Sequence, residues 1–85
     1  MKEFEYKIKD KFGIHARPAG LLVKVASKYS CTVEMECRGK NADCKKIFSI
    51  MSLGVKQDDA INIKISGADE TIAYEDIKSF IEKNL

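Results

Sequence analysis

Three stretches of the chain alternate apolar with polar residues, a pattern typical of strands with one buried face. The inward positions are Phe4, Tyr6 and Ile8 in the first stretch, Cys31, Val33, Met35 and Cys37 in the second, and Ile61, Ile63 and Ile65 in the third. Arg38-Gly39 is a turn signal after the second stretch. It predicts a hairpin, completed by a short strand through Ala42 and Cys44.

Apolar residues recur with helical spacing in three further stretches. We expect a helix over residues 16 to about 28, with Pro18 in its first turn and His15 near the N-cap. A short helix is expected from Lys46 to Leu53, with Gly54 as its C-terminal cap, and a final helix is expected after a capping Asp69. The inner faces are Ala19, Leu22, Val23 and Ala26 in the first helix, and Ala73, Ile77, Phe80 and Ile81 in the last.

The predicted order βαββαβα indicates an α+β fold with two layers, in which helices cover one face of an antiparallel sheet. The other face would meet water through polar residues, namely Glu5, Lys7, Glu34, Glu36 and Lys64. The 85 residues suffice for a single domain, residues 1–85, which is too small to enclose a deep substrate cavity.

Composition excludes several classes of protein. The net charge of +2 is too balanced to indicate nucleic-acid binding, and no apolar run is long enough to enter a bilayer. No secretory signal is visible. Three cysteines, Cys31, Cys37 and Cys44, match neither a disulfide framework nor a metal knuckle. We expect reduced core thiols in a cytosolic protein without metal or cofactor.

The segment Gly13-Ile14-His15-Ala16-Arg17-Pro18-Ala19-Gly20 contains the only histidine and the only proline of the chain. A neutral imidazole is nucleophilic near pH 7, and its attack on phosphorus gives a phosphoramidate that can pass the group onward. The N–H groups of Ala16 and Arg17 at the helix start would bind phosphate oxygens. The guanidinium of Arg17 would add a cation with a planar donor fork.

The outer face of the first predicted helix also indicates a docking surface. This face, opposite the core, carries Arg17, Gly20, Leu21, Lys24 and Lys28. The short helix adds Ile47, Phe48 and Met51, which either extend this surface or form ordinary core. An apolar patch rimmed by Lys24, Lys28, Lys45 and Lys46 suits a transient partner with acidic edges.

The segment from Gly13 to Ala19 resembles the active-site motif of the HPr family, the histidine-containing phosphocarriers of the bacterial sugar phosphotransferase system. Ile50-Met51-Ser52-Leu53-Gly54 resembles the family's second signature, and Gly67-Ala68-Asp69-Glu70 is also similar. The resemblance spans the chain and implies an open-faced β-sandwich, whose four-stranded antiparallel sheet is covered on one face by three helices.

The same resemblance implies a cytoplasmic, monomeric carrier rather than a self-contained enzyme. Enzyme I would phosphorylate Nδ1 of His15, and an EIIA domain of a sugar permease would receive the group. Arg17 and the backbone amide of Ala16 would stabilise the phosphoryl group. The implied docking positions are Gly20, Leu21, Lys24, Ile47, Phe48, Met51 and Leu53.

Two residues depart from the family pattern. Lys46 occupies the position where many relatives of Gram-positive type have a regulatory serine, so phosphorylation there is impossible and the local charge is reversed. Phe12 is bulky where the family often has a small polar residue, and we expect it to shield the histidine partly.

Two alternatives to the phosphocarrier remain at this point. The first is a regulatory module of the same fold that docks partners without phosphotransfer, although such a module needs no nucleophile. The second is a metal or redox protein that uses the cysteines, for which the sequence offers no plausible ligand spacing.

Overall fold

The computed structural model describes residues 1–85 and has the predicted element order βαββαβα. The elements are β1 (Lys2–Lys7), α1 (Ala16–Ala26), β2 (Thr32–Cys37), β3 (Lys40–Asp43), α2 (Ile47–Ser52), β4 (Ala60–Ser66) and α3 (Glu70–Asn84). Several elements are shorter than the apolar pattern suggested. The first helix ends at Ala26 rather than near residue 28, because Ser27 already forms its C-cap, and Cys44 lies just beyond β3.

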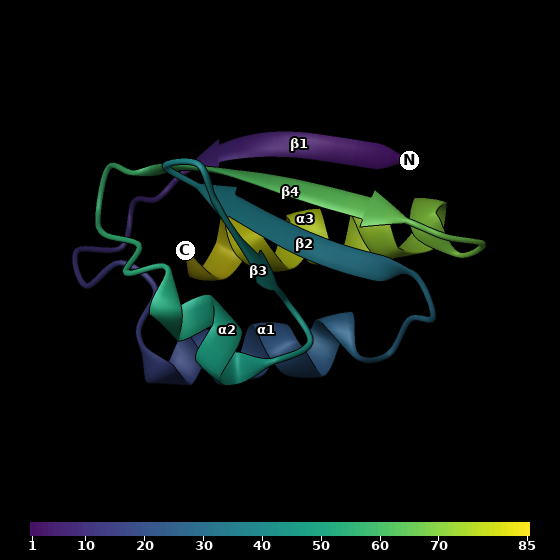
Figure 1. The fold of residues 1–85 in the computed structure, drawn as a ribbon, viewed down its shortest axis with the longest axis horizontal. Coiled ribbons are helices and arrows are strands. Elements are labelled where there is room, and N and C mark those ends of the chain that lie inside the picture. Colours follow the sequence, from purple (N-terminus) through teal and green to yellow (C-terminus); the bar gives the residue numbers. More distant parts are fainter.

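The four strands form one antiparallel sheet in the order β1-β4-β2-β3. Figure 1 shows this sheet as one layer, with the three helices packed against the same side. The register places Phe4 of β1 and Met35 of β2 on either side of Ile63 in β4. Directly opposite residues share a face of the sheet, so these three side chains point to the same core. The structure thus confirms the predicted fold class.

The core contains the inward residues that the alternating pattern predicted. Val33, Met35 and the three isoleucines of β4 are all buried, while Phe4 and Tyr6 pack partly buried at its edge. Of the predicted helix faces, Val23 and Phe80 are likewise only partly buried against the core. On the opposite face of the sheet, Lys64 lies 3.4 Å from a carboxylate oxygen of Glu36.

The three cysteines are free thiols within this core. Burial raises the pKa of Cys44 to about 12 and also raises the pKa of Cys31 and of Cys37. These thiols are therefore neutral packing groups rather than nucleophiles near pH 7. No group of three or more His, Cys, Asp or Glu side chains is arranged to hold a metal ion. None of the helices combines the length and apolar character that crossing a membrane requires.

The start of α3 differs from the prediction. Asp69 occupies the N-cap position, but its side chain makes no capping hydrogen bond. Its carboxylate instead accepts hydrogen bonds from the N–H of Ser30, at 2.8 Å, and from the N–H of Cys31, at 3.0 Å. These hydrogen bonds hold the pKa of Asp69 below its ordinary value, and the bond from the N–H of Ser30 has the largest effect. The carboxylate thus fastens the α1–β2 loop to α3, a long-range contact that local sequence does not reveal.

Candidate functional site

The N-terminal end of α1 is open and carries no internal anion. His15 is the N-cap residue, with an extended backbone and no side-chain capping hydrogen bond, and the first turn contains no acidic residue. The N–H groups of Ala16 and Arg17 have no acceptor within the helix, and Pro18 has no N–H to satisfy. Two backbone donors and the positive end of the helix dipole are therefore free to meet an external anion.

The imidazole of His15 lies at this helix start, with 44% of its side-chain surface exposed. Its Nε2 atom lies 3.8 Å from Oδ2 of Asp10. The Phe12 ring, itself largely exposed, meets the imidazole edge-on at a centroid distance of 5.7 Å and an interplanar angle of 74°. The imidazole is thus accessible to an incoming group, and it is flanked by two loop residues, Asp10 and Phe12.

Arg17 and His15 share one shallow hollow of about 210 Å³, whose other lining residues are Asp10, Pro18, Leu21 and Asn84. Arg17 is exposed, and its guanidinium makes no ion pair or hydrogen bond within the chain. Two larger hollows lie along the β2–β3 edge and on the open face of the sheet, but neither contains a histidine. The smaller hollow is the one that combines an accessible imidazole, an unpaired guanidinium and free backbone amides.

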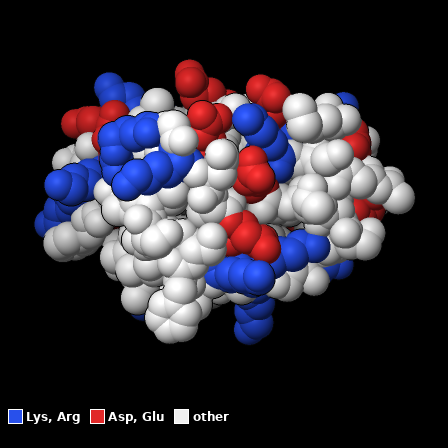
Figure 2. Space-filling model, in the orientation of Figure 1, with Lys and Arg blue, Asp and Glu red and all other residues white.

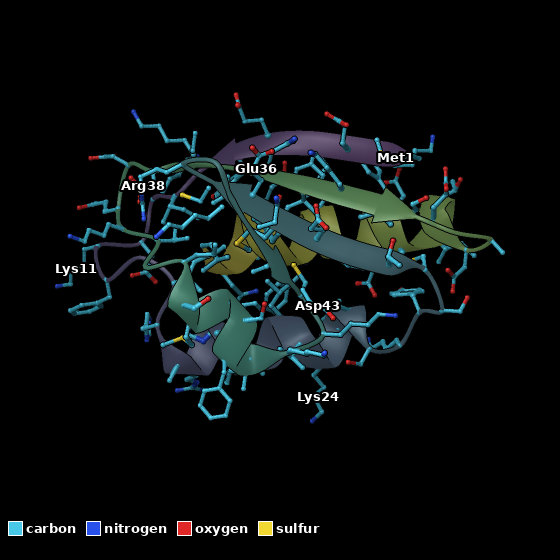
Figure 3. All side chains as sticks on the ribbon, in the orientation of Figure 1. Met1, Lys11, Lys24, Glu36, Arg38 and Asp43 are labelled. Atoms are coloured by element: carbon cyan, nitrogen blue, oxygen red, sulfur yellow. The ribbon has the colours of Figure 1, made fainter.

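The surface beside this hollow exposes large apolar side chains. Leu21 of α1 is 41% exposed, whereas Phe48 and Met51 of α2 are 86% and 38% exposed. In Figure 2, uncharged atoms gather over α2, and basic side chains lie to the right of them at the bottom of the view. Lys24 extends from α1 into solvent on this lower side of the molecule (Figure 3). Phe48 and Met51 therefore belong to the surface and not to the core.

Three other residues of the expected docking set lie deeper. Gly20 is partly buried between the two helices, where a Cβ atom would lie 3.7 Å from Cδ1 of Ile47. Ile47 is itself partly buried against the core. Leu53 is only 4% exposed, so its side chain belongs to the core rather than to the surface. These residues hold α2 against α1 and the sheet, whereas the exposed residues are available to a partner.

An arginine that the sequence did not single out holds the end of α2 in place. Arg38, in the β2–β3 turn (Figure 3), donates hydrogen bonds to the carbonyl oxygens of Leu53, at 2.8 Å, and Gly54, at 3.1 Å. It also pairs with Asp59. The pKa of Asp59 is lowered most by the hydrogen bond from the N–H of Lys56 and next by the hydrogen bond from Arg38. The signal available in the sequence was only a turn residue before glycine, which gave no indication of a helix-fixing role.

The open sandwich and its histidine-bearing helix start are features of a small phosphocarrier. A family model described as the PTS HPr component phosphorylation site matches residues 2–83. The chain is 45% identical over 85 residues to the phosphocarrier protein HPr of Mycoplasma genitalium, covering 99% of this chain and 97% of that relative.

Solved structures agree with this match. A mycoplasma histidine-containing phosphocarrier protein superposes with a TM-score of 0.94 at 34% identity, covering 96% of this chain and 93% of the other. HPr from Thermoanaerobacter tengcongensis gives a TM-score of 0.92 at 42% identity, covering 98% and 93%. The chain belongs to the HPr family and is a phosphocarrier of the sugar phosphotransferase system.

Proposed function

We propose that His15 is the phosphoryl acceptor, that enzyme I supplies the group and that EIIA domains of sugar permeases receive it. The observation that supports this most directly is the hollow shared by His15 and Arg17 at the vacant start of α1. The carrier acts in the cytoplasm as a monomer, and it completes no reaction of its own because the group only rests on it between donor and acceptor.

The chemistry follows from the groups in this hollow. The Nδ1 lone pair of His15 attacks phosphorus, while the bond to the donor breaks and its electron pair leaves with the donor. The N–H groups of Ala16 and Arg17 donate to the phosphoryl oxygens, and the guanidinium of Arg17 balances their charge. Phe12 shields one side of the ring from water, which prolongs the lifetime of the phosphoramidate.

The docking surface is the exposed part of α1 and α2, namely Leu21, Lys24, Phe48 and Met51, supported from beneath by Gly20, Ile47 and Leu53. An apolar centre bordered by lysines fits partners with an apolar patch and acidic edges. Such a contact is suited to brief encounters, because the charged rim accelerates association without requiring a tight complex.

Incubation with enzyme I, labelled phosphoenolpyruvate and Mg²⁺ tests the proposal. The wild-type chain should acquire one acid-labile phosphoryl group, and His15→Ala should acquire none, since no second histidine exists. Arg17→Ala should slow labelling by about 100-fold, whereas Lys7→Ala, which removes an exposed cation from the open face of the sheet, should not.

Labelling that persists in His15→Ala would refute the assignment of the acceptor. Equal partner affinity of wild type and His15→Ala, with no transfer by either, would instead indicate a regulatory docking module.

A further inference from the structure

Asp10, five residues before the histidine, is held in place by three hydrogen bonds. Its N–H donates to the main-chain oxygen of Leu85 at 2.9 Å, and its carbonyl oxygen accepts from the N–H of Gly13 at 2.9 Å. Its Oδ1 atom accepts from the N–H of Phe12 at 2.8 Å. The residue is therefore anchored to the end of α3 and to its own loop, so its carboxylate has a defined direction.

The second carboxylate oxygen of Asp10 points toward the histidine. Its Oδ2 atom lies 3.8 Å from Nε2 of His15, and it has no other partner in the chain. This separation is longer than a hydrogen bond, but it is within the range of an ion pair, and both side chains are partly shielded from water: Asp10 is 27% exposed and His15 is 44% exposed. Contacts of this kind often tighten when the reacting complex forms.

We infer that Asp10 is a positioning residue for His15, which keeps the proton on Nε2 and so presents the Nδ1 lone pair to phosphorus. The inference rests on the proposed function, because it assigns Asp10 a part in phosphorylation of His15. An anion beside Nε2 favours the tautomer with hydrogen on that nitrogen, since an N–H dipole is attracted to the carboxylate and a lone pair is repelled.

The same carboxylate stabilises the charge that the reaction creates. When Nδ1 forms its bond to phosphorus, the bond from phosphorus to the phosphorylated donor breaks, and its electron pair leaves with the donor. The imidazole keeps its proton on Nε2 and therefore carries a positive charge until that proton passes to solvent. Asp10 faces the nitrogen that carries this proton, an arrangement that resembles the buried aspartate which orients the histidine in hydrolase triads.

The variant Asp10→Asn tests this role with little change to the loop. An asparagine side chain keeps an oxygen that can accept from the N–H of Phe12, so the turn is preserved while the charge facing His15 is lost. Asp58→Asn is the matched control. Asp58 is exposed, its side chain makes no hydrogen bond or ion pair, and its positive φ of 73° suits asparagine.

Two measurements are made on both variants. The ¹⁵N chemical shifts of His15 report how the proton is divided between its ring nitrogens, and the rate of labelling by phospho-enzyme I reports transfer. In Asp10→Asn the fraction of His15 protonated on Nε2 should fall, and the transfer rate should drop about fivefold, in keeping with a partly exposed charge pair. Asp58→Asn should match wild type in both.

Either of two results overturns the inference: a ring proton distribution in Asp10→Asn equal to that of Asp58→Asn, or, where the wild-type chain accepts the phosphoryl group, a transfer rate equal for the two variants. The turn alone would then explain Asp10. The ¹⁵N measurement needs no phosphoryl donor, so it remains informative even if the wild-type chain fails to accept a phosphoryl group. Failure of the proposed function and failure of this inference are thus distinguishable.

Discussion

The N-terminal ends of α1 and α3 both carry the positive end of a helix dipole, but they differ in their acidic residues. At the start of α3, Asp69 and Glu70 are acidic, and both are engaged by the chain itself. Asp69 accepts from two N–H groups of the α1–β2 loop, and Glu70 accepts from the N–H of Gly67 at 3.1 Å. At the start of α1 there is no acid in the first turn and no capping bond.

This difference separates a helix start with a structural role from the one that we propose to bind a phosphoryl group. A helix N-terminus attracts anions wherever it occurs, so its use depends on whether the chain supplies the anion. Near α3 the acidic side chains join distant segments and stabilise the fold. At α1 the partly exposed His15 takes the capping position, and the free amides remain available to an anion.

Removing one free amide at the start of α1 should slow transfer more than any change at α2 or α3. Ala16→Pro deletes an N–H, yet proline is well tolerated at the first helical position, and the extended backbone of His15 suits a residue before proline. We expect labelling by phospho-enzyme I to slow about tenfold, with the helix intact by circular dichroism. Ala16→Gly keeps the amide and serves as the control. Equal rates for the two variants would mean that this amide does not contact the phosphoryl group.

A smaller effect on transfer is expected when the approach to α1 is altered. Lys46 is the exposed N-cap residue of α2, and Lys46→Glu should slow transfer from enzyme I about threefold at low salt, with the difference shrinking as salt rises. Lys7→Glu makes the same charge change on the open face of the sheet and should leave the rate unaltered. If both variants slow equally, net charge rather than the docking surface controls the encounter.

Breaking the start of α3 should leave transfer unchanged and affect stability alone. Asp69→Ala removes both hydrogen bonds to the α1–β2 loop, so the melting temperature at neutral pH should fall by a few degrees. The pKa of Asp69 is lowered from 3.8 in the folded protein, so its stabilisation is complete above that value and is lost as pH falls through the lower folded pKa. The melting temperatures of wild type and Asp69→Ala should therefore converge below about pH 4, a trend that thermal melts across pH would test.

Side-chain pattern, together with the turn signal at Arg38-Gly39, predicted every element of the fold, because each strand or helix buries one face in a single core. Its errors lie at the ends of elements, as at Ala26 and Cys44, where capping and strand pairing rather than side-chain pattern set the boundary. The motif around His15 also placed the histidine at a helix start, since Pro18 is a strong signal for a first turn.

Side chains that act across long stretches of sequence were not predictable in this way. Asp69 was expected to cap its own helix and instead binds backbone 38 and 39 residues away. Arg38 was read only as a turn residue, yet it fastens α2. Leu53 was assigned to the docking surface from its motif, yet its side chain is buried. In each case the partner is chosen by the packing of the sheet on the helices.

The sequence alone determined the layered α+β fold, the place of His15 at a helix start and the place of Arg17 beside it, since all three depend on residue type and local spacing. Tertiary structure decided the strand order, the exposure of α2 and the direction of the Asp10 carboxylate toward His15. Those features depend on contacts between segments far apart in the chain, whose relative positions are fixed only when the common core closes.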